Sequence, residues 1–223
     1  MGLSVSEAVA ARMSTRAFLD RAVETGVIRD VLGRAARAPS GGNLQPWHLY
    51  VLNGDSMSRF RAVMEPKLSD NPMGETPEYA VYPPDLKEPY RTRRYVVGEA
   101  MYGLLGIGRE NRLGRLQWFQ NNDRFFGAPA AVFCFTDRIM GPPQWSDLGM
   151  MLQTAMLLFA EQGLATCPQE AWCRWPRTVA EFVGAPGELM LFCGMAIGFA
   201  DPDAAVNRLR TERAPVQEFL TVV

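Results

Sequence analysis

The feature that most constrains the fold is a predicted helix over residues 147–162 that is apolar on nearly every side. Ser146 stands where an N-cap is expected, and Gly163 stands just beyond the C-terminal end. The apolar residues that surround the helix are Leu148, Met150, Met151, Leu152, Met156, Leu157, Leu158 and Phe159. A helix without a polar face is buried on all sides, so we expect it in the core or between two subunits. At about 16 residues it is too short to span a membrane.

Apolar runs predict strands at 49–52, 130–135, 165–167 and 188–199. Helices are expected at 4–12, 27–37 and 95–108. One further helix is expected to carry Met57, and another is expected to begin at Pro176. Ser4 with Glu7, and Thr178 with Glu181, have the spacing of capping boxes. Helices and strands in mixed order predict an α+β fold in which helices flank one central sheet. We therefore expect residues 1–223 to form a single domain.

Two segments do not fit this regular pattern. Residues 66–94 contain six prolines and three interleaved tyrosines, a density that predicts neither a regular helix nor a central strand. We expect an ordered excursion that either lines a pocket or packs against a partner subunit. Residues 201–223 form a C-terminal arm with several arginines and no predicted packing partner.

Composition excludes several classes of function. The net charge of −1 provides no bulk attraction to nucleic acid or to an anionic membrane, and no apolar run reaches the roughly 20 residues of a membrane helix. None of the four cysteines forms a Cys-x-x-Cys pair, which suggests buried thiols in a reducing, cytoplasmic environment. His48 is the only histidine, so neither a zinc-like ligand cluster nor an ordinary catalytic triad is expected.

The segment Arg12-Met13-Ser14-Thr15-Arg16 places two guanidiniums and two hydroxyls at the end of the first predicted helix. Guanidiniums offer paired donors to a phosphate, and hydroxyls can satisfy its remaining oxygens. The alternative is a solvated helix end, where basic residues favour the helix dipole. On its own the motif does not decide between these two interpretations.

A second motif, Pro39-Ser40-Gly41-Gly42-Asn43-Leu44-Gln45-Pro46-Trp47-His48, runs directly into the strand at 49–52. Its small and amide-bearing residues can bring polar groups close to a flat heterocycle without bulky side chains in the way. One ligand that carries both a phosphate and a polar-edged ring would use both motifs. Flavin mononucleotide (FMN) is such a ligand.

The order of these motifs along nearly the whole chain resembles the nitroreductase family of FMN-dependent oxidoreductases. The resemblance implies a mixed, mostly antiparallel central sheet and an intertwined homodimer with FMN at the subunit interface. It implies that Arg12, Ser14 and Arg16 hold the phosphate and the nearby edge of the cofactor. Pro39, Ser40, Gly41 and Asn43 would come from the other subunit to line the ring and ribityl chain.

The same resemblance implies that the backbone of Gln169 and Glu170 lies against the reactive flavin nitrogen, and that Arg213, with Arg210, completes the phosphate site. The implied activity is hydride transfer from NADH or NADPH to a nitroaromatic, quinone or similar small acceptor by a ping-pong mechanism. No catalytic side chain and no metal are then needed, because the ring carries the chemistry.

Several alternatives stay open from the sequence. The scaffold could serve another flavin chemistry, such as reductive dehalogenation or flavin reduction, or the chain could bind FMN or another phosphorylated ligand without catalysis. A structural dimer without cofactor is a further possibility. Trp145, Asp147 and Tyr90 are candidates for contact with substrate, although packing explains Trp145 and a favourable helix dipole explains Asp147 equally well.

Overall fold

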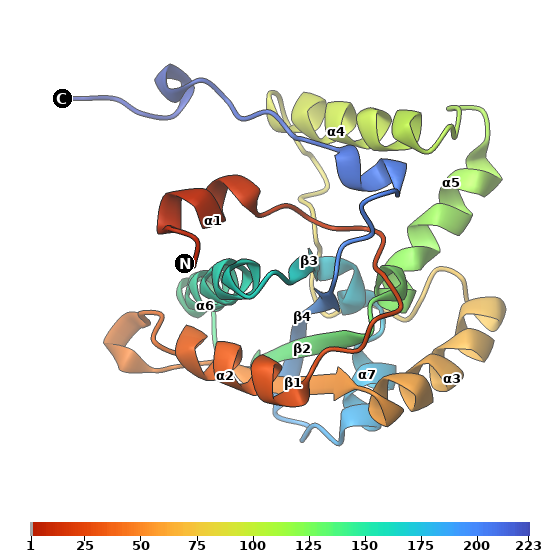
Figure 1. The fold of residues 1–223 in the computed structure, drawn as a ribbon, viewed down its shortest axis with the longest axis vertical. Helices are drawn as coiled ribbons and strands as arrows, with labels where there is room; N and C mark the ends of the chain where they lie inside the picture. Colours follow the sequence, from red (N-terminus) through yellow and green to blue (C-terminus); the bar gives the residue numbers. More distant parts are fainter. Residues whose placement is uncertain (1) are drawn as a thin grey trace.

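Four antiparallel strands form one sheet in the order β1-β2-β4-β3. In the computed structural model, which describes residues 2–223, the strands are β1 (His48–Asn53), β2 (Ala130–Asp137), β3 (Ala165–Gln169) and β4 (Leu189–Gly198) (Figure 1). The expected α+β fold is therefore confirmed, but all three strand pairings are antiparallel. Within the described residues, the expected mixed character is limited to one isolated parallel bridge, between Ser14 and Thr166.

Helices cover both faces of this sheet. The bounds of the helices are α1 (Val5–Ala11), α2 (Thr25–Ala35), α3 (Asp55–Asp70), α4 (Tyr90–Leu104), α5 (Arg112–Phe119), α6 (Pro142–Glu161) and α7 (Pro176–Val183). The short 3-10 segments are η1 (Gly41–Asn43), η2 (Gln120–Gly127), η3 (Glu170–Arg174), η4 (Ala205–Arg208) and η5 (Val216–Glu218). Within residues 2–223, no helix is both long and apolar enough to cross a membrane.

The period of two along β2 and β4 divides the core into two halves. Val132 and Met195 face α2 and α6, whereas Phe133 and Leu191 face α3, α7 and η3. Most of these side chains are completely buried. The two layers of helix thus hold the sheet between them, and both ends of β3 lie beside segments that carry polar residues.

The apolar helix begins five residues earlier than the sequence predicts. Gly141 is the N-cap of α6, and Ser146 lies inside the helix, where its hydroxyl donates to the carbonyl of Pro143 at 2.6 Å. The prolines at 142 and 143 occupy the first turn, in which a missing N–H costs no helical hydrogen bond. Gly163 has φ +70° just beyond the helix, as expected. Met150 on this helix remains 39% exposed, so burial on all sides requires a further surface.

The prediction that residues 66–94 contain no regular helix is wrong at both ends. Helix α3 continues to Asp70 with Pro66 inside it, because Met64 and Leu68 are buried on either side of the proline and outweigh one lost hydrogen bond. Helix α4 begins at Tyr90 instead of residue 95. Helix α5 has no counterpart among the predicted helices.

Glu75 fastens the excursion between these helices to the start of α7. Its carboxylate accepts from the hydroxyl of Thr178 at 2.6 Å and from the backbone N–H of Arg177 at 2.9 Å. Thr178 is therefore not part of a capping box with Glu181, and the first turn of α7 is capped by a residue about a hundred positions earlier. Further along, the hydroxyl of Tyr79 donates to the carbonyl of Phe192.

Gly194 in β4 is the point where the sheet and the indole of Trp172 approach most closely. A Cβ atom at Gly194 would overlap the Trp172 ring, whose side chain is completely buried. We expect Gly194→Ala to lower the free energy of unfolding by about 1–3 kcal/mol, because the buried ring has no room to retreat. The measurement is urea unfolding of the purified protein followed by far-UV circular dichroism.

The matched control is Gly26→Ala in α2, where nothing lies within 4 Å of the added Cβ. This variant should be unchanged or more stable by up to about 1 kcal/mol, because alanine favours the helix. Equal stability of the two alanine variants would show that the contact between Gly194 and Trp172 is not tight.

Asp123 in η2 is a buried carboxylate whose only cationic hydrogen-bond partner among the described residues is Arg174, at 2.9 Å and 3.0 Å. Burial raises the pKa of Asp123 to about 6, and the guanidinium of Arg174 only partly opposes this effect. Because the folded-state pKa lies above the ordinary value of 3.8, the folded chain binds this proton more tightly than the unfolded chain does. The contribution of Asp123 to stability is therefore full below about pH 4 and is lost as the pH rises through about 6.

We expect the difference in unfolding free energy between the parent protein and Asp123→Asn to fall by about 2–3 kcal/mol between pH 4 and pH 7. The asparagine keeps the shape of the side chain but does not titrate, so other ionisable groups cancel in the difference. Urea unfolding of both proteins across this range measures the effect. A difference that is constant or that grows with pH would contradict it.

Candidate functional site

The segment Arg12–Arg16 leaves α1 in an extended conformation and runs along β3. The backbone N–H of Thr15 donates to the carbonyl of Thr166 at 2.9 Å, and Thr15 is buried. One residue later, the backbone N–H of Arg16 donates to the side-chain oxygen of Asn207 in η4 at 2.9 Å. The segment is therefore fixed between the edge of the sheet and the start of the C-terminal arm.

This arrangement brings Arg210 to the same place. One guanidinium nitrogen of Arg210 lies 2.7 Å from the sulfur of Met13 and 3.1 Å from the carbonyl of Asn207. Arg213 follows in the arm, where its guanidinium donates to the hydroxyl of Thr211 at 2.6 Å. Both arginines line a groove of about 890 Å³ between the arm and α4.

Within residues 2–223, no carboxylate forms an ion pair with Arg12, Arg16, Arg210 or Arg213. Arg12, Arg16 and the two arginines of the arm line separate hollows, and Arg210 reaches the segment at Met13. A guanidinium without a carboxylate partner remains available to an anion, which agrees with the phosphate interpretation of the first motif. The side chain of Arg16 turns back to donate to the carbonyl of Ser14 at 3.3 Å.

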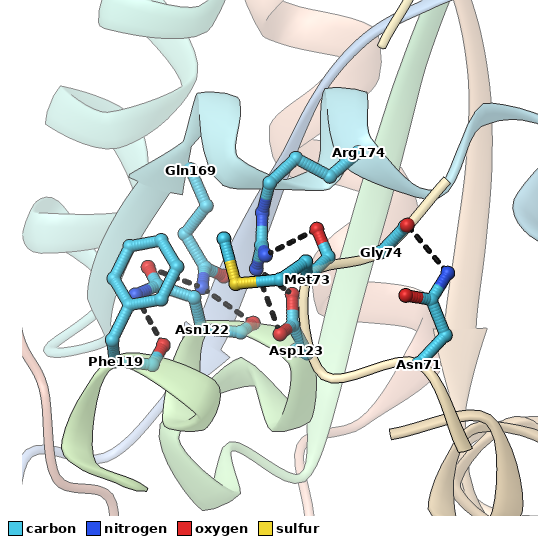
Figure 2. A network of polar contacts seen from close by, with 8 residues as sticks. All are labelled: Asn71, Met73, Gly74, Phe119, Asn122, Asp123, Gln169 and Arg174. Carbon is cyan, nitrogen blue, oxygen red and sulfur yellow. Dashed lines mark hydrogen bonds and ion pairs between the residues drawn. The ribbon is translucent and has the colours of Figure 1, made fainter. Parts of the chain in front are cut away.

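The turn after β3 lies beside η2. Gln169 is buried and donates from its side-chain nitrogen to the carbonyl of Asn122 at 2.8 Å, whereas Glu170 is exposed (Figure 2). The backbone at Gln169 and Glu170 thus leaves the sheet at a fixed point, next to a polar segment from another part of the chain.

A pocket of about 400 Å³ lies between the segment at Arg16, η2 and α3, and neither Gln169 nor Glu170 lines it. Arg16 lines it together with Asn121 and Arg124 from η2 and the indole of Trp118. Arg124 also forms an ion pair with Glu65, at 2.8 Å and 3.0 Å. The sequence analysis missed Asn121 and Arg124. The signal that the sequence offers for them is the polar run Gln120-Asn121-Asn122-Asp123-Arg124, five residues before β2, and such a run is not specific.

The loop at residues 39–43 lies at the other end of α6. The backbone N–H of Gly41 donates to the carboxylate of Asp147 at 3.2 Å, near the N-terminal end of that helix. Arg12 and Thr15 instead share a small pocket with Met156 and Ala160, toward its C-terminal end. Asp147 and Ala160 are separated by thirteen residues, about 20 Å along a helix. In a single chain the two motifs therefore do not converge.

The structure assigns other roles to the remaining candidates. Asp147 is buried and holds Gly41, Trp145 packs against Tyr79 with ring centroids 5.5 Å apart, and Tyr90 is 59% exposed at the start of α4. His48 is exposed at the start of β1. Burial raises the pKa of all four cysteine thiols, of Cys134 and Cys167 to about 12, so these groups are poor nucleophiles.

Comparison with known proteins agrees with this geometry. The model of the family described as the nitroreductase family matches residues 9–199. A 4-nitrobenzoate reductase from Pseudomonas putida is 35% identical over 95% of this chain and 92% of its own length. A chloronitrobenzene nitroreductase from Comamonas testosteroni is 33% identical over 98% of this chain and 96% of its own.

Among solved structures, the FMN and NADPH-dependent nitroreductase NfnB from Sphigopyxis sp. strain HMH is similar along the whole chain. It superimposes with a TM-score of 0.95, is 45% identical, and the match covers 99% of both chains. The arginine-bearing segment at 12–16 and the turn at Gln169–Glu170 both lie within the region that the family model matches. The chain therefore belongs to the nitroreductase family.

Proposed function

We propose that this protein is an FMN-dependent oxidoreductase that uses NADH or NADPH to reduce nitroaromatic compounds, quinones or related electrophiles. The observation that carries the proposal is that Arg12, Arg16 and Arg210 have no ion-pair partner among the described residues and stand on two segments that meet beside β3. The relatives support the substrate class, since two of them are named for reduction of nitrobenzoate and chloronitrobenzene. A similar solved enzyme is named as FMN and NADPH-dependent.

The residues present fit FMN in the chemistry of their donors. Arg12, Arg16, Arg210 and Arg213, with the hydroxyl of Ser14, supply the guanidiniums and hydroxyl that a phosphate dianion requires. The pocket beside Arg16 adds the polar side chains of Asn121 and Arg124 and the aromatic wall of Trp118, which suit a flat ring with a polar edge. We propose that the ring lies between this pocket and the turn at Gln169–Glu170, because the hydrogen bond from Gln169 to Asn122 joins that turn to the η2 segment that lines the pocket.

When bound, FMN accepts a hydride from the nicotinamide and passes reducing equivalents to the acceptor. The task of this chain is then to bind and orient. The arginines hold the phosphate, the β3 turn presents backbone N–H groups at a fixed position, and the buried side of the turn excludes water. Such preorganised donors stabilise charge that develops on a bound ring. No described side chain is needed as a nucleophile.

We further propose that two copies of the chain form the site. Pro39, Ser40, Gly41 and Asn43 lie at the opposite end of α6 from the arginines, so their side of the cofactor must come from a second subunit. The exposed apolar residues of the arm, Phe219, Leu220 and Val222, and the unpaired outer edge of β1 are surfaces that a second copy would cover. We propose that residues 2–223 act as one FMN-binding domain in this assembly.

Charge reversal at the arginine group tests the phosphate site. We expect Arg16→Glu to weaken FMN binding by more than about 30-fold, because a carboxylate then faces the phosphate. Reconstitution of the flavin-free protein with FMN, followed by fluorescence quenching, measures the dissociation constant.

The control is Arg59→Glu, which reverses an exposed arginine on α3 outside the site and should leave the constant unchanged within about twofold. If Arg16→Glu binds FMN as tightly as this control, the phosphate site is elsewhere. If the parent protein takes up no FMN at all, the proposed function itself is wrong.

Polar substitution of the C-terminal arm tests the dimer. We expect Phe219→Lys combined with Leu220→Lys to raise the dimer dissociation constant at least about tenfold, because two exposed apolar side chains lose their cover. Mass photometry over a dilution series measures it. Ile139→Lys is the control, since Ile139 is 85% exposed in the turn after β2 and outside the arm. An unchanged dimer would show that the arm does not form the interface, and a monomer that retains FMN would contradict the shared site.

A panel of acceptors distinguishes the reaction from other flavin chemistry. After anaerobic reduction by NADPH or NADH, we expect a nitroaromatic compound or a quinone to reoxidise the flavin rapidly. Reoxidation only by free flavin or by a halogenated aromatic compound would instead assign flavin reduction or reductive dehalogenation.

A further inference from the structure

Two consecutive residues of η2 are joined to the segment that follows β3. The carbonyl of Asn122 accepts from the side chain of Gln169 at 2.8 Å, and the two carboxylate oxygens of Asp123 both accept from one guanidinium nitrogen of Arg174, at 2.9 Å and 3.0 Å (Figure 2). We refer to Asn122, Asp123, Gln169 and Arg174 as the η2–η3 clamp. In Figure 2 the side chains of Gln169 and Arg174 both reach toward η2.

The residues of the clamp are neighbours in the sequence of residues that we assign to the site. Asn122 and Asp123 stand between Asn121 and Arg124, which line the pocket beside Arg16. In the segment that follows β3, the exposed Glu170 lies between Gln169 and Arg174 in the sequence. The contacts Gln169–Asn122 and Arg174–Asp123 therefore fix the position of η2, which lines the pocket, relative to the turn at Glu170.

Arg174 also connects the clamp to the segment between α3 and α4. Its second guanidinium nitrogen donates to the carbonyl of Met73 at 3.0 Å, and its own carbonyl accepts from the backbone N–H of Glu75 at 2.6 Å. The guanidinium also lies over the ring of Phe119, 4.6 Å from the centroid. One side chain thus contacts η2, the end of α5 and the loop that leads toward α4.

The ion pair between Asp123 and Arg174 is buried, which restricts the relative positions that the two side chains can take. The side chain of Asp123 is completely buried and that of Arg174 is 14% exposed. A buried ion pair adds little net stability, because the loss of hydration offsets the attraction, but removal of one partner is costly. Its strength lies in the direction of its hydrogen bonds, which permit one relative placement of the two segments.

We propose that Asp123 and Arg174, supported by Gln169, are positioning residues that hold the pocket wall at Asn121 and Arg124 in register with the flavin-facing turn at Glu170. This inference rests on the proposed function. Asp123 and Arg174 do not themselves reach the ring. They act through the backbone segments that do.

The test uses the full-length protein with Asp123→Asn, Arg174→Lys, Arg174→Met and Gln169→Met. The control is Glu99→Gln, which removes an ion pair outside the clamp. In this pair, two guanidinium nitrogens of Arg115 on α5 donate to the two carboxylate oxygens of Glu99 on α4, at 2.6 Å and 3.1 Å. FMN is the probe. Three quantities are measured: the FMN dissociation constant, the visible circular dichroism of bound flavin at saturation, and hydrogen exchange of residues 119–124 and 169–174.

We expect Arg174→Met to weaken FMN binding at least about tenfold, to change the visible circular dichroism, and to speed exchange in both segments. Arg174→Lys should retain part of the effect of arginine, since lysine keeps the charge but has a single nitrogen in place of the two that contact Asp123 and the carbonyl of Met73. Gln169→Met should have a smaller effect on all three quantities, because it removes the hydrogen bond to Asn122 and leaves the contact between Arg174 and Asp123. Glu99→Gln should match the parent protein in all three measurements.

Clamp variants that bind FMN within twofold of the parent, with the same visible spectrum, would overturn the proposal even if their unfolding midpoints fall. That result would mean that the clamp only stabilises the fold. If Asp123→Asn does not fold, Arg174→Lys and Gln169→Met decide the matter. Failure of the parent protein to bind FMN would instead refute the proposed function, so the two failures are distinguishable.

Discussion

The hydrogen bond from the backbone of Thr15 to the carbonyl of Thr166 is the contact on which the candidate site depends. It lays the segment with Arg12 and Arg16 along β3, so that these arginines stand beside the strand whose end carries Gln169 and Glu170. The C-terminal arm then adds Arg210 through Asn207 and Met13. Segments from three distant parts of the sequence, which we propose bind the anion, are thus held together by one main-chain hydrogen bond and by the side chains of Asn207 and Arg210.

Helix α6 is the element on which the proposed dimer depends. Its ends separate the loop at Gly41 from the segment at Arg12 by about 20 Å along the helix. Its apolar surface and that of the C-terminal arm also remain partly exposed, at Met150 and Phe219 for example. In the dimer that we propose, the same helix completes the core of one subunit, separates the two motifs of the site and offers apolar surface to a second copy.

The sequence predicted the strands and the cap at Ser4, because each depends on local periodicity or on a short pattern of residues. The phosphate-binding role of the arginine motif stays a prediction. It failed where distant contacts decide the structure. Pro66 is tolerated in α3 because Met64 and Leu68 are buried, and Thr178 is bound by Glu75 instead of Glu181. For the same reason, Asn121, Asp123 and Arg174 were not recognised. Their importance comes from a pairing between η2 and η3, and no spacing along the chain indicates such a pairing.

The central claim is that each FMN site combines the arginines of one subunit with the loop of the other. Co-expression of Arg16→Glu subunits with Gly41→Tyr subunits, under two different affinity tags, tests it directly. In a symmetric dimer with shared sites, the purified heterodimer has one site with both defects and one with neither, so it should bind about one FMN. If each site lay within one chain, both sites would carry a defect and the heterodimer would bind no FMN, a result that would contradict the account.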